Sequence, residues 1–286
     1  YEQPRSCSNG CSYRRNRGLG SSSDSISLVE PGDQSNDLYA PIADLYDAEH
    51  CCWIEDLDLY KALASRSGSP VLDLGCGSGR VGISLAESGH KVHGIDTSDA
   101  LLAIARRTAC ARDLSITFAR KDIRRFRNEV GYSLVFCALD TLLHLSDPKD
   151  LANALDSSFR ALRVGGLLAL DIVNPTPDLL AIGDGVVRKQ STFRSHDNTE
   201  ITHFVSWDVD PEWQTISAHH FYDWICDQNN VRRCAVSFQL RYWHHDQVEQ
   251  ALRDAGFRQL ELYGSHHLDN FHHGSERIIF VGTRPP

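Results

Sequence analysis

The stretch that decides the fold is residues 71–80, which read Val-Leu-Asp-Leu-Gly-Cys-Gly-Ser-Gly-Arg. Its first four residues form a short, largely apolar run of the kind found in buried strands. Three glycines then alternate with small residues, and glycine allows a sharp turn and a close approach of a ligand to the backbone. The stretch therefore predicts a strand, a ligand-binding turn and the start of a helix.

The alternation of strand and helix continues beyond this stretch. Apolar runs that predict strands lie at residues 71–74, 91–95, 116–119, 134–138 and 167–173. Helical patterns lie between or beside them at residues 81–88, 99–110 and 149–162. A helix at 246–255 and strands at 259–263 and 278–282 resume the pattern. Short apolar strands joined by helices predict a parallel sheet with helices on both faces.

Two regions flank this pattern. Before the glycine turn, apolar residues from Leu38 through Ala64 recur at helical spacing and predict lid helices. Between residues 186 and 243, segments such as 202–208, 215–224 and 231–243 predict antiparallel strands. The expected fold is α/β, with a doubly wound, mostly parallel seven-stranded sheet and an antiparallel β insertion after the fifth strand.

The composition narrows the classes of partner. Asp and Glu outnumber Lys and Arg by 38 to 29, and the formal net charge of -9 argues against non-specific binding to nucleic acid or an anionic membrane. No apolar run reaches the roughly 18 residues of a membrane helix. The nine cysteines, an odd number, indicate free thiols in a reducing compartment. We therefore expect a cytoplasmic protein without nucleic-acid or membrane partners.

The histidine doublets do not predict a metal site. They begin at residues 219, 244, 266 and 272, and adjacent residues on a strand face opposite ways, which makes a doublet a poor ligand pair. The Cys7 and Cys11 pair lacks a second pair at a zinc-like spacing. We therefore expect no bound metal.

Two carboxylates suggest which ligand the glycine turn holds. Asp96 closes the strand after the turn, where a carboxylate can accept hydrogen bonds from both ribose hydroxyls of a nucleoside. Asp73 lies at the end of the first strand, where it would repel a pyrophosphate but suit an ammonium group. Arg80 also stands where a dinucleotide fold would place its third glycine. A nicotinamide-dependent oxidoreductase is therefore the disfavoured alternative.

Asp-Leu-Gly-Cys-Gly-Ser-Gly at residues 73–79 resembles the first motif of the class I methyltransferases that use S-adenosylmethionine (SAM). Lys121-Asp122-Ile123-Arg124 is similar to the family's adenine-contacting segment, with Lys121 in place of the usual glycine. Residues 136–145, which end in His-Leu, resemble the segment after strand four in small-molecule methyltransferases. The resemblance implies SAM as the cofactor and transfer of its methyl group to nitrogen or oxygen of a small molecule. A SAM-binding protein without transfer activity is a further alternative.

The resemblance and the charge pattern together assign a set of cofactor-binding residues. They follow the turn, the acid after the second strand, the adenine segment, the end of strand four and the N-terminal lid: Tyr46, Asp73, Gly75, Cys76, Gly77, Gly79, Arg80, Asp96, Thr97, Asp122, Ile123, Cys137 and Ala138.

Three residues are candidates for catalysis. Methyl transfer is an in-line displacement, so the enzyme mainly has to orient the acceptor, which must present a lone pair. His144 follows the fourth strand and would accept a proton, and Asp140 would orient a cationic acceptor. Tyr46 resembles a tyrosine that small-molecule N-methyltransferases place over the sulfonium. Each of the three would alternatively serve packing or a turn.

The predicted organisation has four parts. Residues 1–36 are expected to be a disordered tail, and residues 37–185 to form the SAM-binding core with its lid helices. Residues 186–243 form the β insertion, as a cap over the acceptor or as a dimer face. Residues 244–286 complete the core. The expected partner is a small-molecule acceptor, and a homodimer is possible.

Overall fold

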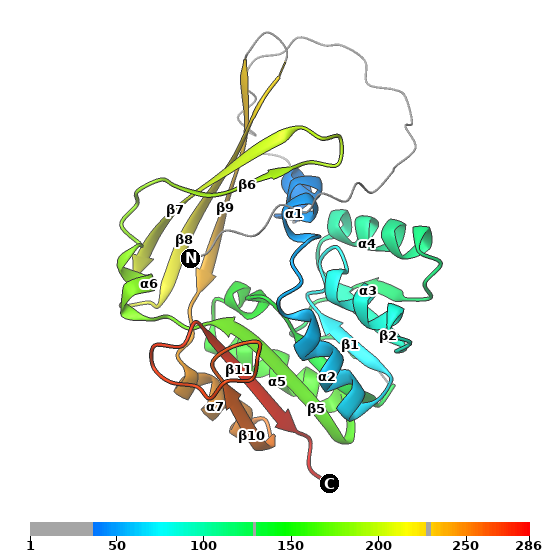
Figure 1. The fold of residues 1–286 in the computed structure, drawn as a ribbon. Coiled ribbons are helices and arrows are strands. Elements are labelled where there is room, and N and C mark those ends of the chain that lie inside the picture. The colour runs from blue at the N-terminus through cyan, green and yellow to red at the C-terminus, as the bar shows by residue number, and fades with distance from the viewer. Residues whose placement is uncertain (1–36, 128–129, 227–229) are drawn as a thin grey trace.

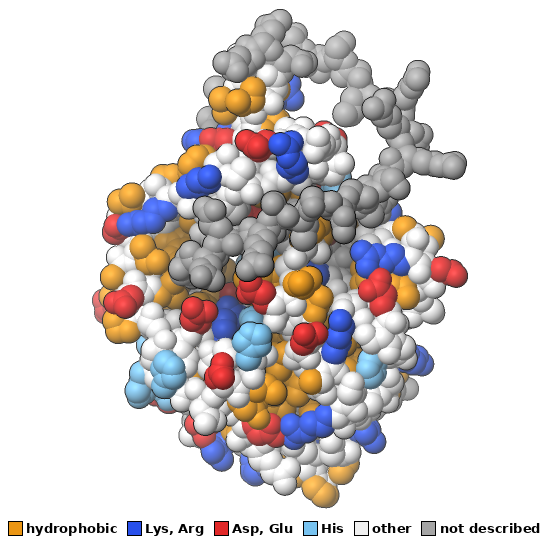
Figure 2. Space-filling model, viewed as in Figure 1, with side chains coloured by type: hydrophobic (Ala, Val, Ile, Leu, Met, Phe, Trp, Pro, Cys, Tyr) orange, Lys and Arg blue, Asp and Glu red, His pale blue; other side chains and the backbone are white. Residues whose placement is uncertain are grey.

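The computed structural model describes residues 37–127, 130–226 and 230–286, so the predicted tail at 1–36 lies outside the described residues. Figure 1 shows a layered α/β core with a long antiparallel sheet projecting from it. On the face drawn in Figure 2, acidic and basic side chains are interspersed without a continuous basic surface.

The core is built on one seven-stranded sheet in the order β10-β11-β5-β4-β1-β2-β3. Strands β1 to β5 pair in parallel, whereas β11 is antiparallel to both β5 and β10. The strands are β1 (Val71–Leu74), β2 (Val92–Asp96), β3 (Thr117–Arg120), β4 (Tyr132–Cys137), β5 (Leu162–Val173), β10 (Arg258–Tyr263) and β11 (Arg277–Thr283). This topology confirms the predicted doubly wound sheet. Because the strand order reverses between β1 and β4, the crevice at their carboxyl ends is where such folds bind ligands.

Helices cover both faces of the core sheet. Strand residues alternate between two apolar clusters: one packs against α5 and α7, and the other against α2 and α3. The helices are α2 (Leu57–Ser67), α3 (Arg80–Glu87), α4 (Asp99–Ala111), α5 (Pro148–Ala161) and α7 (His245–Asp254). Helix α4 begins where expected because the Ser98 side chain accepts a hydrogen bond from the Leu101 amide.

The N-terminal segment is not one continuous helix. It consists of a 3-10 turn, η1 (Ala40–Ile42), then α1 (Ala43–His50), and a break before α2. Helix α1 lies between the projecting sheet and α4, whereas α2 packs on the core sheet (Figure 1). The break separates two helices that pack on different partners, which spacing along the sequence does not reveal.

The insertion is a separate four-stranded antiparallel sheet in the order β6-β7-β8-β9. Its strands are β6 (Arg188–Arg194), β7 (Glu200–Asp210), β8 (Thr215–Ile225) and β9 (Val231–Arg241), preceded by the short helix α6 (Pro177–Ala181). One face of the sheet packs on Ile42 through Ile201, Tyr222 and Phe238. The same face contacts η2 (Thr141–His144) after β4. The insertion therefore lies over the carboxyl ends of the core strands.

Candidate functional site

The glycine turn has a backbone that other residues would strain. Gly75, Gly77 and Gly79 all have positive φ angles, of 67°, 53° and 86°. The amides of Gly75 and Cys76 both donate to the Ile95 carbonyl, at 2.8 and 3.0 Å. A Cβ on Gly75 would come within 2.3 Å of Cγ2 of Thr141, so this position has no room for a side chain. The turn therefore lies directly under the loop after β4.

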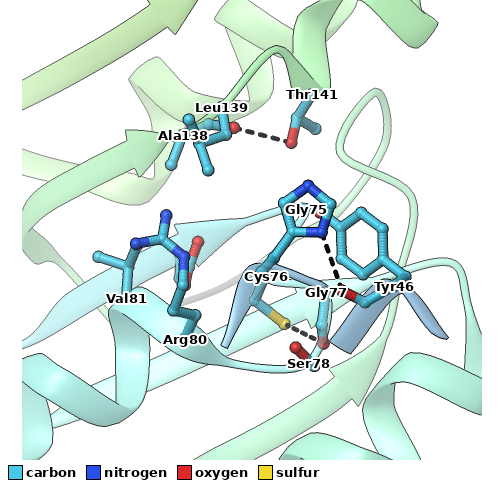
Figure 3. Close-up of a pocket in the computed structure, with 12 residues that line it drawn as sticks. Tyr46, Gly75, Cys76, Gly77, Ser78, Arg80, Val81, Ala138, Leu139 and Thr141 are labelled. Atoms are coloured by element: carbon cyan, nitrogen blue, oxygen red, sulfur yellow. Dashed lines mark hydrogen bonds between the residues drawn. The ribbon is translucent and has the colours of Figure 1, made fainter. Parts of the chain in front are cut away.

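A pocket opens above this turn (Figure 3). It is lined by Tyr46, His50, Asp73, Gly75, Cys76, Gly77, Ser78, Arg80, Val81, Ala138, Leu139 and Thr141. Seven of the predicted cofactor residues are among these: Tyr46, Asp73, Gly75, Cys76, Gly77, Arg80 and Ala138. His50 and Thr141 are additional lining residues that the sequence analysis missed. Thr141 stands inside a segment already singled out, and His50 lies one helical turn after Tyr46.

Asp73 and Arg80 bring a carboxyl group and a guanidinium to the pocket wall. The Asp73 side chain is 3% exposed, and burial raises its pKa from 3.8 to about 8. The Arg80 guanidinium forms a two-pronged ion pair with the buried carboxylate of Asp56, with both contacts at 2.6 Å. It also donates to the Trp53 carbonyl at 2.8 Å. Arg80 therefore ties the break between α1 and α2 to the start of α3.

Asp96 connects the turn to the second strand. Its carboxylate accepts hydrogen bonds from the amides of Gly77 and Ser98, both at 2.8 Å. Burial raises the pKa of Asp96 despite these bonds. Thr97 beside it is exposed. These contacts hold the carboxylate at the carboxyl end of β2, next to the glycine turn.

Three other predicted cofactor residues, Asp122, Ile123 and Cys137, contact other side chains of the protein. The Asp122 carboxylate accepts hydrogen bonds from the amide and the guanidinium of Arg124, at 2.7 to 3.0 Å. The side chains of Ile123 and Cys137 are buried in the apolar cluster under α5 and α7. None of these three residues, nor Gly79, Asp96 or Thr97, is among the lining residues of the pocket. Their contact with a cofactor stays a prediction.

Aromatic rings extend the pocket toward the insertion. The Tyr46 ring stacks on His50 with 4.2 Å between centroids and meets Tyr39 edge-on at 5.3 Å. The Tyr39 hydroxyl lies 3.0 Å from Nε2 of His144, and the Tyr39 ring is 5.0 Å from the Phe238 ring of β9. Burial raises the pKa of Tyr39 and Tyr46, the latter to about 12, and lowers the pKa of His144. Both phenols and a neutral imidazole are therefore present at neutral pH.

Asp140 has a different set of contacts from the one its sequence position suggested. It adopts a left-handed backbone with φ of 66° and accepts a hydrogen bond from the Val173 amide at 2.6 Å. Arg277 of β11 bridges it to Asp171, which is 1% exposed. The Asp171 carboxylate is also 3.0 Å from Nε2 of His266. Asp140 thus anchors the loop that carries Ala138, Leu139 and Thr141, and its contact with an acceptor stays a prediction.

The described residues contain neither a cluster of metal ligands nor a membrane-spanning helix. No group of three or more His, Cys, Asp or Glu side chains is placed to hold a metal ion there. Among the helices within 37–127, 130–226 and 230–286, none has the length and apolar character needed to cross a membrane.

Comparisons with known proteins agree with this geometry. Residues 71–166 match the family model described as a methyltransferase domain. The structure superposes on the CcbJ methyltransferase from Streptomyces caelestis with a TM-score of 0.70 and 25% identity, covering 87% of this chain and 99% of that one. The sugar N-methyltransferase KedS8 from Streptoalloteichus sp. ATCC 53650 shares the fold, with a TM-score of 0.69, 20% identity and coverage of 94% and 100%.

Curated sequences give the same assignment. A provisionally named methyltransferase of Geobacillus sp. (strain WCH70) is 27% identical over 227 residues, 78% of this chain and 88% of the relative. A ubiquinone biosynthesis O-methyltransferase of Pseudomonas aeruginosa (strain LESB58) is 30% identical over 115 residues, 40% of this chain and 48% of the relative. These findings do not favour the oxidoreductase alternative, and they agree with the predicted cofactor, SAM. Residues 71–166 form a methyltransferase domain, and the chain resembles SAM-dependent methyltransferases in sequence and fold.

Proposed function

We propose that this chain transfers the methyl group of SAM to an amine nitrogen of a small polar molecule. One observation carries the proposal: a row of aromatic rings leads from the cofactor pocket to the insertion, through Tyr46, Tyr39 and Phe238. Aromatic faces attract cations, and a protonated amine is a cation. The sugar N-methyltransferase of the same fold is consistent with this acceptor.

The pocket residues suit the two ends of the cofactor. The methionine part of SAM carries an ammonium, which would meet Asp73 once the carboxyl proton has left, and a carboxylate, which would meet the guanidinium of Arg80 on the same wall. Asp96 would accept hydrogen bonds from the ribose hydroxyls at the end of β2. Gly75 and Gly77 line the pocket without a side chain, so a ligand can approach their backbone closely.

The protein's part in the reaction is chiefly orientation. When bound, SAM supplies an electrophilic methyl group, whose bond to sulfur breaks with its electron pair staying on sulfur as the nitrogen–carbon bond forms. Tyr39 and Tyr46 would hold the amine on the axis of that bond, and the loop anchored by Asp140 would close one side. The loop and the insertion together exclude water from this space.

Two measurements test the proposal. Calorimetric titration with S-adenosylhomocysteine is expected to show micromolar binding, with no binding of NADH. Transfer of labelled methyl from SAM is then measured with a panel of small amines and their matched hydroxyl analogues. We expect methylated amines. Methylation of the hydroxyl analogues alone would show that the acceptor atom is oxygen, and NADH binding would contradict the assignment altogether.

A further inference from the structure

A hydrogen-bonded chain of three ionisable side chains lies on the inner face of the insertion. It joins Glu49 of α1, His203 of β7 and His220 of β8, which are far apart in the sequence. Oε1 of Glu49 lies 2.9 Å from Nδ1 of His203, and Nε2 of His203 lies 2.9 Å from Nδ1 of His220. The side chains of Glu49 and His203 are 12% and 6% exposed. We call these three residues the relay.

The protonation state of each side chain determines which atoms of the relay donate a hydrogen bond and which accept one. Burial acts to raise the pKa of Glu49. The hydrogen bond from His203 and the neighbouring imidazoles outweigh this effect, so the pKa of Glu49 is lowered overall. An ionised carboxylate can only accept, so Nδ1 of His203 donates to it. With His203 neutral, its Nε2 accepts from Nδ1 of His220, which leaves Nε2 of His220 with a free lone pair. Among the described residues, none forms a hydrogen bond with that Nε2 atom.

The His220 end of the relay lies next to Phe238, whose ring also contacts one of the predicted catalytic residues, His144. The His220 ring packs edge-on against Phe238, at 5.4 Å between centroids. Phe238 in turn lies 5.0 Å from Tyr39 and 5.7 Å from His144. At the other end, Glu49 is followed by His50, which lines the cofactor pocket. The relay therefore runs beside the cofactor pocket and ends next to the aromatic rings.

The surroundings keep His220 neutral. Burial first, and the neighbouring His203 imidazole next, lower the pKa of His220 to about 4. The other ionisable groups that act on it are Glu49 and His50 of α1 and its neighbour His219. Glu49 is the one acidic group in this set, so the relay with two neutral imidazoles carries one negative charge.

We propose that the relay is the proton acceptor for the amine substrate, with Nε2 of His220 as the atom that touches it. This inference rests on the proposed amine methylation. A protonated amine has no lone pair to attack with, so one of its protons must leave before transfer. The negative charge of the relay and the free Nε2 atom provide both the attraction and the acceptor.

The relay can take up the proton that the substrate loses in this step. The ammonium of the substrate gives one proton to Nε2 of His220, which passes its Nδ1 proton to Nε2 of His203. His220 ends as the other neutral tautomer, and His203 becomes an imidazolium paired with the Glu49 carboxylate at 2.9 Å. The substrate becomes a neutral amine, and the relay later returns its proton to solvent. His220 thus conducts the proton without ever holding a positive charge, which agrees with its low pKa.

His144 is less suited to this step in the present geometry. Its Nε2 atom lies 3.0 Å from the Tyr39 hydroxyl, so that atom already has a partner. The Tyr39 phenol keeps its proton, and the direction of its hydrogen bond with Nε2 is set by the tautomer of His144. The pair would orient the amine, and the relay would deprotonate it.

The test compares His220→Asn with a matched control, His219→Asn. His219 lies on the opposite face of β8, where its Nδ1 atom is 2.8 Å from the Ser237 hydroxyl. With an amine that the wild-type protein methylates, we expect His220→Asn to lower kcat by about 100-fold at pH 7. Activity should recover above the pKa of the amine, where solvent has already removed the proton. His219→Asn should match the wild type, and S-adenosylhomocysteine affinity should be unchanged in both variants.

Other outcomes separate the relay from the proposed function. A loss in His220→Asn that is equal at every pH, or no loss at all, would overturn the relay while leaving amine methylation intact. Methylation of hydroxyl analogues alone by the wild-type protein would instead overturn the proposed acceptor. Nitrogen NMR of the free protein gives a readout without substrate: Nε2 of His220 should be unprotonated at pH 7. A proton on that atom would contradict the relay by itself.

Discussion

The floor and the roof of the site are built in different ways. The floor is the glycine turn, residues 71–80, which contributes consecutive residues to the proposed cofactor pocket. The roof is assembled from side chains of α1, η2, β7, β8 and β9, which meet only when the insertion folds over the core. A floor of backbone tolerates few substitutions. A roof of side chains can change its acceptor without disturbing cofactor binding.

The roof also shows how one strand serves two faces. His219 and His220 are adjacent, yet the first is bonded to Ser237 on the outer face and the second to His203 on the inner face. The pairing of β8 with both neighbours fixes this alternation. The two histidines of this doublet do not form a metal site together. Each makes its own contacts on its own face of the sheet.

The largest expected effect concerns the buried ion pairs of Arg277 with Asp140 and Asp171, which anchor the loop next to the floor. Arg277→Met should destabilise the protein by about 3 to 5 kcal/mol, since it removes the guanidinium that pairs with the buried carboxylate of Asp171. Although burial acts to raise it, the charge of Arg277 lowers the pKa of Asp171 to about 2. Denaturant unfolding measures the loss. The control is Arg66→Met, which removes an exposed pair with Glu261 and should cost less than about 1 kcal/mol. Equal losses would contradict the structural role of the buried network.

The next effect lies in the floor itself. Gly75→Ala should cost about 2 to 4 kcal/mol, because it adds a collision with Thr141 to the strain of a positive φ. Gly68→Ala is the matched control, with a φ of 86° but no atom within 4 Å of the new Cβ. It should cost about 1 kcal/mol. Thermal unfolding and S-adenosylhomocysteine titration check both. A Gly75→Ala variant with unaltered affinity would show that the turn does not shape the pocket.

A smaller effect should appear in the pH dependence of cofactor binding. Asp73 has a pKa of about 8, so the free protein holds a proton there at neutral pH that an incoming ammonium must displace. Affinity for S-adenosylhomocysteine should therefore rise by up to about tenfold per pH unit between pH 6 and 8. The stability of the free protein should show the opposite pH dependence. Because the pKa of Asp73 is higher in the folded state than in the unfolded chain, its contribution to the free energy of unfolding falls as the pH rises from 6 to 8.

Calorimetry at several pH values measures this dependence. Asp73→Asn should weaken binding and flatten the pH profile. A wild-type profile that is already flat would mean that Asp73 does not meet the ammonium group.

The smallest expected effect lies in the roof. Phe238→Leu keeps an apolar side chain but removes the ring that contacts Tyr39, His144 and His220. We expect a loss of stability near 1 kcal/mol and an increase of about tenfold in the KM for the amine. S-adenosylhomocysteine affinity should stay within about twofold. If cofactor affinity fell as much as acceptor affinity, the floor and the roof would not be separable.

Much of the fold and of the floor could be predicted from the sequence alone. The run at 71–74, the alternating glycines and the acid at Asp96 are local signals, because a strand, a tight turn and its ligand-facing backbone involve neighbouring residues. The mostly parallel sheet and the antiparallel insertion followed from patterning of the same kind. These features need no knowledge of distant contacts.

The tertiary structure alone decided the rest. It placed Arg277 against Asp140, 137 residues away in the sequence, and divided the N-terminal helical pattern where Asp56 pairs with Arg80. It also brought Tyr39 to His144 and assembled the relay from three elements. Such contacts depend on packing and strand register, which place particular side chains together over long separations. Periodicity along the chain records which face is buried, but it does not record what lies opposite that face.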